Sequence, residues 1–153
     1  MQDGRALQDV LKVQCFGCGS LNEHGLQIKS QWVGDDLVCR WPPEPFHIGY
    51  PGKVYGGTIA SIVDCHSMWT AMAEHCRDTG HDLEAAAPPF AFVTGKLTVS
   101  YLKPMSIDAE IVLNARVVKK GERTAVVVCR VMQDGIECAT SEVVAVRVAV
   151  PNS

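Results

Sequence analysis

The segment Val54–Cys76 places the strongest constraint on how this chain can fold. It reads VYGGTIASIVDCHSMWTAMAEHC, and its apolar residues spread round more than one face of a helix. A helix with this pattern needs cover on nearly every side rather than one docking partner. We therefore expect a long buried helix with a curved sheet wrapped around it.

Asp64 stands in the middle of this helix, between Val63 and Cys65. An unpaired carboxylate is costly to bury, so Asp64 is either a solvated residue on a narrow polar stripe or a group retained for chemistry. Its own stripe of the helix carries mostly small side chains, which would leave room for a ligand. The residues of this stripe are Gly57, Ala60, Ser61, Ser67, Met68 and Ala71.

Length, charge and cysteine content limit the class of protein. The chain has 153 residues, 47% hydrophobic and 20% charged, which suits one domain (1–153) with a substantial core. A net charge of −3 without a long Lys/Arg run disfavours nucleic acid and membrane surfaces as partners. Residues 1–14 lack the apolar stretch of a leader peptide, and no apolar run reaches the roughly 18 residues of a membrane span. The seven cysteines are an odd number, so we expect reduced thiols in a soluble, cytoplasmic protein.

The pattern on both sides of the helix predicts an antiparallel sheet. Residues 26–33 and 37–41 alternate around a Gly-Asp-Asp turn and predict a hairpin. Beyond the helix, further runs have the two-residue period of half-buried strands. These runs are 97–101, 109–118, 123–132 and 136–150. One helix and about six strands place the chain in the α+β class.

Two segments are less regular. The first 25 residues contain a candidate helix over Leu7–Val13 and a Cys/Gly-rich loop from Cys15 to Gly25. Residues 77–92 form a connection that is longer than usual, and we expect it to be a lid or a loop that lines the site.

Three blocks of the sequence then carry a family pattern. They are CFGCGSLNEHGL (Cys15 to Leu26), HIGYPGKVYGGTIASIVD (His47 to Asp64) and VTGKLTVSYLKP (Val93 to Pro104). With them the chain resembles the hotdog-fold acyl-CoA thioesterases of the phenylacetate-pathway type over nearly its whole length. The resemblance implies a hotdog fold, in which a curved antiparallel sheet of about six strands wraps the central helix, and hydrolysis of an acyl-CoA thioester.

The same resemblance assigns roles to site residues. It implies that Asp64 is the catalytic carboxylate, that Gly56 is the backbone donor to the thioester carbonyl, and that Thr94 helps to place the attacking water. An ordinary strand threonine is the alternative for Thr94. The family histidine before the glycine pair is Tyr55 in this chain. A non-catalytic hotdog protein that binds acyl thioesters in the same groove is therefore the alternative function.

The residue types and their spacing also support this chemistry without the resemblance. Thioester hydrolysis needs a carboxylate that attacks the carbonyl or activates water, and donors for the developing oxyanion. The Gly56-Gly57 pair offers free N–H groups at the positive end of a helix, although a simple loop-to-helix turn would use the same pair. Eight residues put Gly56 and Asp64 roughly 12 Å apart along the axis, too far to act on one carbonyl. We therefore expect a homodimer or a dimer of dimers, in which a two-fold axis brings Gly56 of one chain opposite Asp64 of the other.

Other polar residues have narrower roles. We expect contacts to the acyl thioester from Tyr55, Gly57, Ser61, Met68 and His47, and from Lys103 toward the coenzyme A phosphates, where a solvated charge is the alternative. His66 lies about 200° round the helix from Asp64, so we expect a packed core or interface histidine.

The Cys15-x-x-Cys18 pair followed by His24 has the spacing of metal ligands. No second Cys-x-x-Cys follows, and a tetrahedral zinc site needs a fourth ligand. We expect a tight loop packed near the sheet, with no metal and no cofactor.

Overall fold

The computed structural model describes residues 4–151. Six antiparallel strands form one sheet in the order β1-β2-β4-β5-β6-β3. The strands are β1 (Ser30–Val33), β2 (Asp36–Trp41), β3 (Phe90–Tyr101), β4 (Ile111–Lys120), β5 (Thr124–Gln133) and β6 (Ile136–Ala149). The helices are α1 (Leu7–Val10), the short 3-10 turn η1 (Pro45–His47) and the long α2 (Gly56–Thr79). This is the hotdog fold that the sequence predicts, and that prediction is confirmed.

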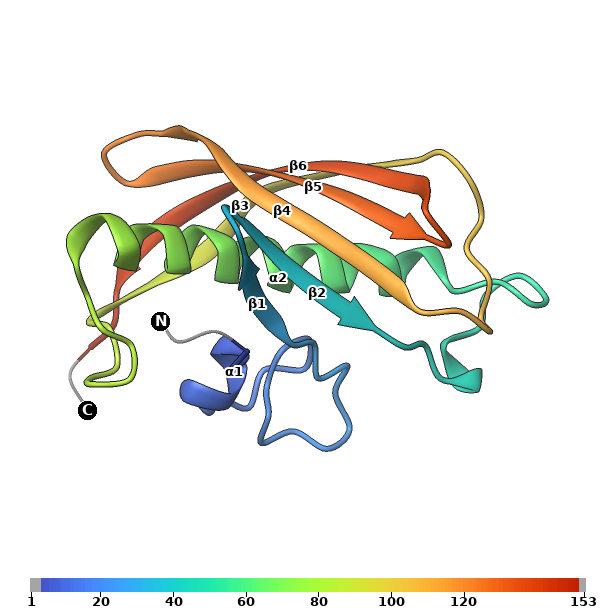
Figure 1. Ribbon diagram of the computed structural model, residues 1–153, viewed down its shortest axis with the longest axis horizontal. Coiled ribbons are helices and arrows are strands. Elements are labelled where there is room, and N and C mark those ends of the chain that lie inside the picture. The colour runs from blue at the N-terminus through green and yellow to red at the C-terminus, as the bar shows by residue number, and fades with distance from the viewer. Residues whose placement is uncertain (1–3, 152–153) are drawn as a thin grey trace.

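Helix α2 lies between the sheet and the N-terminal segment. Figure 1 shows it running along one face of the curved sheet, with α1 and the loop that follows on its other side. Its buried residues, among them Ile59, Ile62, Val63 and Ala73, occupy more than one helical face. The expected cover on several sides is therefore present. Within residues 4–151, no helix is both long and apolar enough to cross a bilayer.

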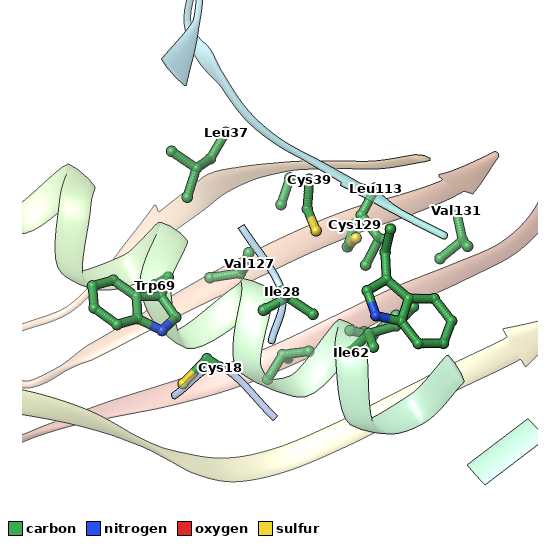
Figure 2. Close-up of a cluster of buried hydrophobic side chains, with 14 of the residues drawn as sticks. Cys18, Ile28, Leu37, Cys39, Ile62, Trp69, Leu113, Val127, Cys129 and Val131 are labelled. Carbon is green, nitrogen blue, oxygen red and sulfur yellow. The ribbon is translucent and has the colours of Figure 1, made fainter. Parts of the chain in front are cut away.

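The core joins all three parts of the fold. Figure 2 shows Ile62 and Trp69 of α2 in one cluster with Leu113 and Val127 of the sheet and Cys18 of the N-terminal segment. Full burial of each large aliphatic side chain in this cluster stabilises the fold by about 1.5–3 kcal/mol. Because α2 is fixed to the sheet along this cluster, the positions of the polar groups on its remaining stripe are also fixed.

A glycine sets the C-terminal end of α2. Gly80 has φ 69° and ψ 20°, and its N–H donates to the carbonyls of Cys76 and Arg77. Glycine adopts this left-handed conformation without the steric cost that other residues meet. The predicted end of the helix near residues 78–80 is confirmed.

The N-terminal boundaries differ from the prediction. The candidate helix over residues 7–13 ends at Val10, because Leu11 is already extended. The first strand begins at Ser30 rather than at Leu26. The N–H groups of Leu26 and Ile28 donate instead to carbonyls of the preceding loop, at 2.8 and 3.3 Å, and Gln27 has a positive φ of 49°. These two N–H groups are therefore bonded within the N-terminal segment and do not pair with a neighbouring strand.

The connection after α2 is shorter than residues 77–92. The helix continues to Thr79 and β3 already begins at Phe90, where it pairs with Ala149 of β6. Within the remaining loop, Leu83 is buried, and with His81 and Asp82 it lines a groove beside Trp32. What remains of the predicted lid or site-lining connection is therefore a loop at the C-terminal end of α2, and it lines the groove beside Trp32.

Candidate active site

Asp64 of α2 and Thr94 of β3 meet in this structure. The Thr94 hydroxyl donates a short hydrogen bond to the Asp64 carboxylate. Asp64 is half-buried and Thr94 is exposed at the edge strand. The pair is separated by 30 residues in the chain, so only the packing of α2 against β3 brings it together.

A bulge in β3 turns Thr94 toward the helix. The register of β3 against β6 shifts between Thr94 and Lys96, so that Thr94 lies opposite Ala145 and Leu97 opposite Val143. Both partners are fully buried, which places Thr94 and Leu97 on the helix-facing side although they are three residues apart. In a regular strand they would face opposite sides.

The bulge leaves little room for a side chain at Gly95. A Cβ on Gly95 would lie 3.0 Å from the Val146 side chain and 3.2 Å from the Val144 carbonyl oxygen. A larger residue would therefore press on β6 and disturb the register that orients Thr94.

Asp64 and Thr94 line an apolar groove of about 530 Å³, which we call the Asp64 groove. Its walls include Met68 and Met72 of α2 and Phe90 and Phe92 of β3. Pockets for small organic ligands have this size and this mixture of apolar walls with a few polar groups. Of the residues expected to contact substrate, Met68 is the one that shares this groove with Asp64.

Gly56 belongs to a second groove, of about 300 Å³, which also contains Lys103 and Tyr101. The Tyr101 hydroxyl donates to the Gly56 carbonyl at 2.5 Å, and burial raises the pKa of this phenol, as does the nearby Tyr55. Within one chain, Gly56 and Asp64 therefore face different grooves.

The start of α2 presents two N–H groups ahead of the helical hydrogen bonds. The N–H groups of Thr58 and Ile59 donate to the Tyr55 carbonyl at 3.0 and 3.3 Å. The N–H groups of Gly56 and Gly57 precede this first turn and have no intrahelical acceptor. Together with the helix dipole, they form a donor pair suited to a partial negative charge.

The Tyr55 ring covers part of this helix start. Tyr55 is 59% exposed, and a Cβ on Gly57 would lie only 2.5 Å from its ring. Glycine at position 57 therefore permits the ring to lie against the helix. Position 55, which Tyr55 occupies, is where the resemblance implies a histidine.

His47 and Ser61 are held by structural hydrogen bonds. The Nδ1 atom of His47 accepts the N–H of Glu44 at 2.8 Å, its ring packs 4.8 Å from Trp41, and burial lowers its pKa. Ser61 donates to the Gly57 carbonyl at 2.9 Å. Neither residue lines the Asp64 groove.

His66 is a core histidine, as the sequence predicts. It is fully buried, and its ring nitrogens contact the Ser30 hydroxyl at 2.8 Å and the Leu37 carbonyl at 3.0 Å. Burial lowers its pKa to about 4, so the ring is neutral at neutral pH. It contributes to packing and not to the Asp64 groove.

Several groups of these grooves had no individual role in the prediction. Phe90 and Phe92 belong to residues 77–92, which were predicted to form a lid or a site-lining loop, and they line the Asp64 groove from β3. Tyr101 was predicted only as a strand residue. Cys15, Cys18 and Cys65 also line the Asp64 groove. The position of Cys65 directly after Asp64 was the one signal in the sequence that could have placed a thiol at this site.

Comparison with known families decides the relationship. A family model described as the thioesterase superfamily matches residues 51–140. This chain belongs to the thioesterase superfamily. The matched region contains Gly56, Asp64 and Thr94, whereas Cys15 and Cys18 precede it.

Individual proteins that are similar to this thioesterase-superfamily chain also include named thioesterases. Acyl-coenzyme A thioesterase 13 of Mus musculus is 31% identical over 91 residues, which span 60% of this chain and 56% of that protein. A thioesterase superfamily protein from Shewanella loihica is 35% identical, with a TM-score of 0.62, over 84% of this chain and 96% of that one. The E. coli PaaI protein of the phenylacetic acid degradation operon is 15% identical, with a TM-score of 0.62 over 81% of each chain, and at that identity it shows the fold alone.

Proposed function

We propose that this protein hydrolyses an acyl-CoA thioester. The observation that carries the proposal is the Asp64 carboxylate, held by the Thr94 hydroxyl, on the wall of an apolar groove of about 530 Å³. Membership of the thioesterase superfamily supports the reaction, and the mouse relative named as an acyl-coenzyme A thioesterase supports the substrate class.

The proposed chemistry uses Asp64 in one of two ways. As a general base, it takes a proton from a water molecule while the water oxygen bonds to the thioester carbon. As a nucleophile, it bonds to that carbon itself, and water later cleaves the mixed anhydride. In both routes the C–S bond breaks, the acyl group leaves as a free acid, and the coenzyme A sulfur takes up a proton. The Thr94 hydrogen bond fixes the orientation of the carboxylate for either route.

The carbonyl donor comes from a partner subunit in this proposal. Gly56 and Asp64 face different grooves of one chain. Strand β3 lies at the edge of the sheet and pairs with β6 alone, so its other edge offers backbone groups to a second β3. A two-fold axis at this edge sets the two α2 helices antiparallel and places Gly56 of one chain near Asp64 of the other.

One observation favours the alternative function. The Tyr55 ring lies against Gly57 at the start of α2, where a thioester carbonyl must reach the Gly56 N–H. If the ring stays there in the dimer, the groove binds an acyl thioester without hydrolysing it. The residues in this alternative are the same, and only the outcome for the bound thioester differs.

Release of free thiol from a panel of acyl-CoA substrates tests the proposal. Replacing Asp64 by Asn keeps its size but removes the carboxylate, so kcat should fall by on the order of 10²–10⁴ with little change in KM. Asp35→Asn is the matched control, because the Asp35 carboxylate is 98% exposed in the β1–β2 turn, and it should keep wild-type constants.

The mechanism and the function are tested by different results. Wild-type turnover by Asp64→Asn on the best substrate would refute the mechanism. No thiol release from any substrate, combined with binding of an acyl-CoA measured by calorimetry, would replace hydrolysis by the binding function.

A further inference from the structure

Three cysteine thiols converge beside Asp64. The sulfur atoms of Cys15, Cys18 and Cys65 all lie within 4.8 Å of one another, and those of Cys15 and Cys65 are 3.7 Å apart. The first two thiols come from the loop after α1 and the third from the middle of α2. Among the described residues, this is the one group of three or more His, Cys, Asp or Glu side chains with such spacing.

The loop is built to approach the helix at this point. A Cβ on Gly17 would lie 2.4 Å from the Cys65 sulfur, so glycine lets the loop lie against α2. The Gly19 N–H donates to the Cys15 carbonyl at 2.7 Å, and a Cβ on Gly19 would meet the Cys15 backbone at 2.5 Å. This tight turn brings both cysteines of the pair to the same thiol of the helix.

The spacing of the sulfur atoms suits a metal ion. A tetrahedral zinc ion with Zn–S bonds of about 2.3 Å sets its thiolates about 3.8 Å apart. The Cys15–Cys65 separation of 3.7 Å is close to that edge, and the other two sulfur separations are no more than 4.8 Å. A disulfide would join only two of the three sulfur atoms, at about 2.05 Å, and would leave the third without a partner.

The three thiols differ in their exposure. Cys18 is buried and Cys15 is exposed. Figure 2 shows the Trp69 ring nitrogen on the side that faces Cys18. The thiolate is the ligand form of cysteine, so a cation that binds here must displace the thiol protons.

We propose that the thiolates of Cys15, Cys18 and Cys65 together bind one divalent cation that favours sulfur ligands, such as Zn²⁺. Binding releases the protons that the three thiols still carry. All three residues line the Asp64 groove, so the cation would bind at the wall of that groove. The third ligand is therefore Cys65 of α2 and not His24, which the sequence spacing suggested. His24 is exposed and lies outside the cluster. This site rests on the positions of the three thiols, which do not depend on the proposed hydrolysis.

Cobalt titration tests the site directly. The protein of residues 1–153 is reduced with a phosphine, freed of metal with a chelator and titrated with Co²⁺ without substrate. A thiolate-to-cobalt charge-transfer band should saturate at one Co²⁺ per chain, and one equivalent of Zn²⁺ should abolish it. Cys18→Ala and Cys65→Ala should lose the band. Cys76→Ala is the matched control, because Cys76 is a buried thiol of the same helix roughly 16 Å further along its axis.

Alkylation followed by mass spectrometry provides a second measurement that does not depend on the variants. In the wild-type protein, Zn²⁺ should protect Cys15, an exposed thiol, from alkylation. Saturation well below one equivalent, a band retained by Cys65→Ala with a native circular dichroism spectrum, or equal alkylation with and without Zn²⁺ would each overturn the proposal. A Cys15–Cys65 disulfide in oxidised protein, with no cobalt band after reduction, would overturn it in favour of a redox pair.

Discussion

Mild acid should destabilise this protein through His66. The Leu37 carbonyl can only accept a hydrogen bond, so the Nε2 atom of His66, 3.0 Å away, carries the proton. The Nδ1 atom then accepts the Ser30 hydroxyl at 2.8 Å, and Ser30 in turn accepts the Gln8 amide at 3.0 Å. Protonation of Nδ1 turns this acceptor into a second donor and leaves the Ser30 hydroxyl proton without its acceptor.

The size of the effect follows from the burial of the ring. Burial lowers the pKa of His66 from 6.5 to about 4, and the hydrogen bond to Leu37 only partly opposes this shift. Between pH 6.5 and 4, the His66 ring is therefore protonated in the unfolded chain and neutral in the folded chain. Stability is fully present above pH 6.5 and falls as the pH drops through this window. The loss is about 2 kcal/mol at pH 5 and about 3 kcal/mol at pH 4.

Urea unfolding at pH 7 and at pH 5 measures this loss when the protein concentration is fixed, because an oligomer unfolds at a concentration-dependent midpoint. The reference variant is His66→Gln, whose amide can donate to Leu37 and accept from Ser30 but does not titrate. Other acidic groups contribute equally to both proteins. The wild-type protein should lose about 2 kcal/mol more than the variant between the two pH values. Equal losses would refute the assignment of a neutral buried histidine.

Two further predictions concern the packing of the chain and its assembly. Gln133 is buried, and its side chain bonds the Ser106 N–H at 2.7 Å and the carbonyls of Ser106 and Ala109 at 2.8 and 3.0 Å. Gln133→Ala should therefore lower the free energy of unfolding by about 2 kcal/mol in urea, and a change below about 0.5 kcal/mol would contradict this clamp. Light scattering of dilute wild-type protein should give a dimer or a dimer of dimers, because Gly56 and Asp64 face different grooves of one chain. A monomer with full turnover would exclude a composite site.

The local pattern of the sequence was sufficient for most of the fold. The helix that contains Asp64 was predicted because apolar residues on several faces and a glycine at its end are signals within one stretch of chain. The strands after it were predicted from their two-residue period. The boundaries failed where distant segments compete for hydrogen bonds, as at Leu26, whose N–H donates to the loop instead of to a strand.

The candidate site depended on the tertiary structure to a greater extent. The resemblance picked out Asp64, Gly56 and Thr94, but only the bulge at Gly95 turns Thr94 onto the helix-facing side. A bulge adds one residue to one strand, and its effect is visible only against the partner strand.

The cysteines make the same point more strongly. The sequence alone offered Cys15 and Cys18 as a pair without enough ligands for zinc. The third thiol, Cys65, is 50 residues away from Cys15 and joins them because Gly17 lets the loop approach α2. Contacts of this kind depend on how two surfaces pack, whereas helices and strands follow from the periodicity of a single segment. The sequence by itself therefore determined the elements and the family, and the packing of the loop, α2 and β3 decided which reactive groups meet.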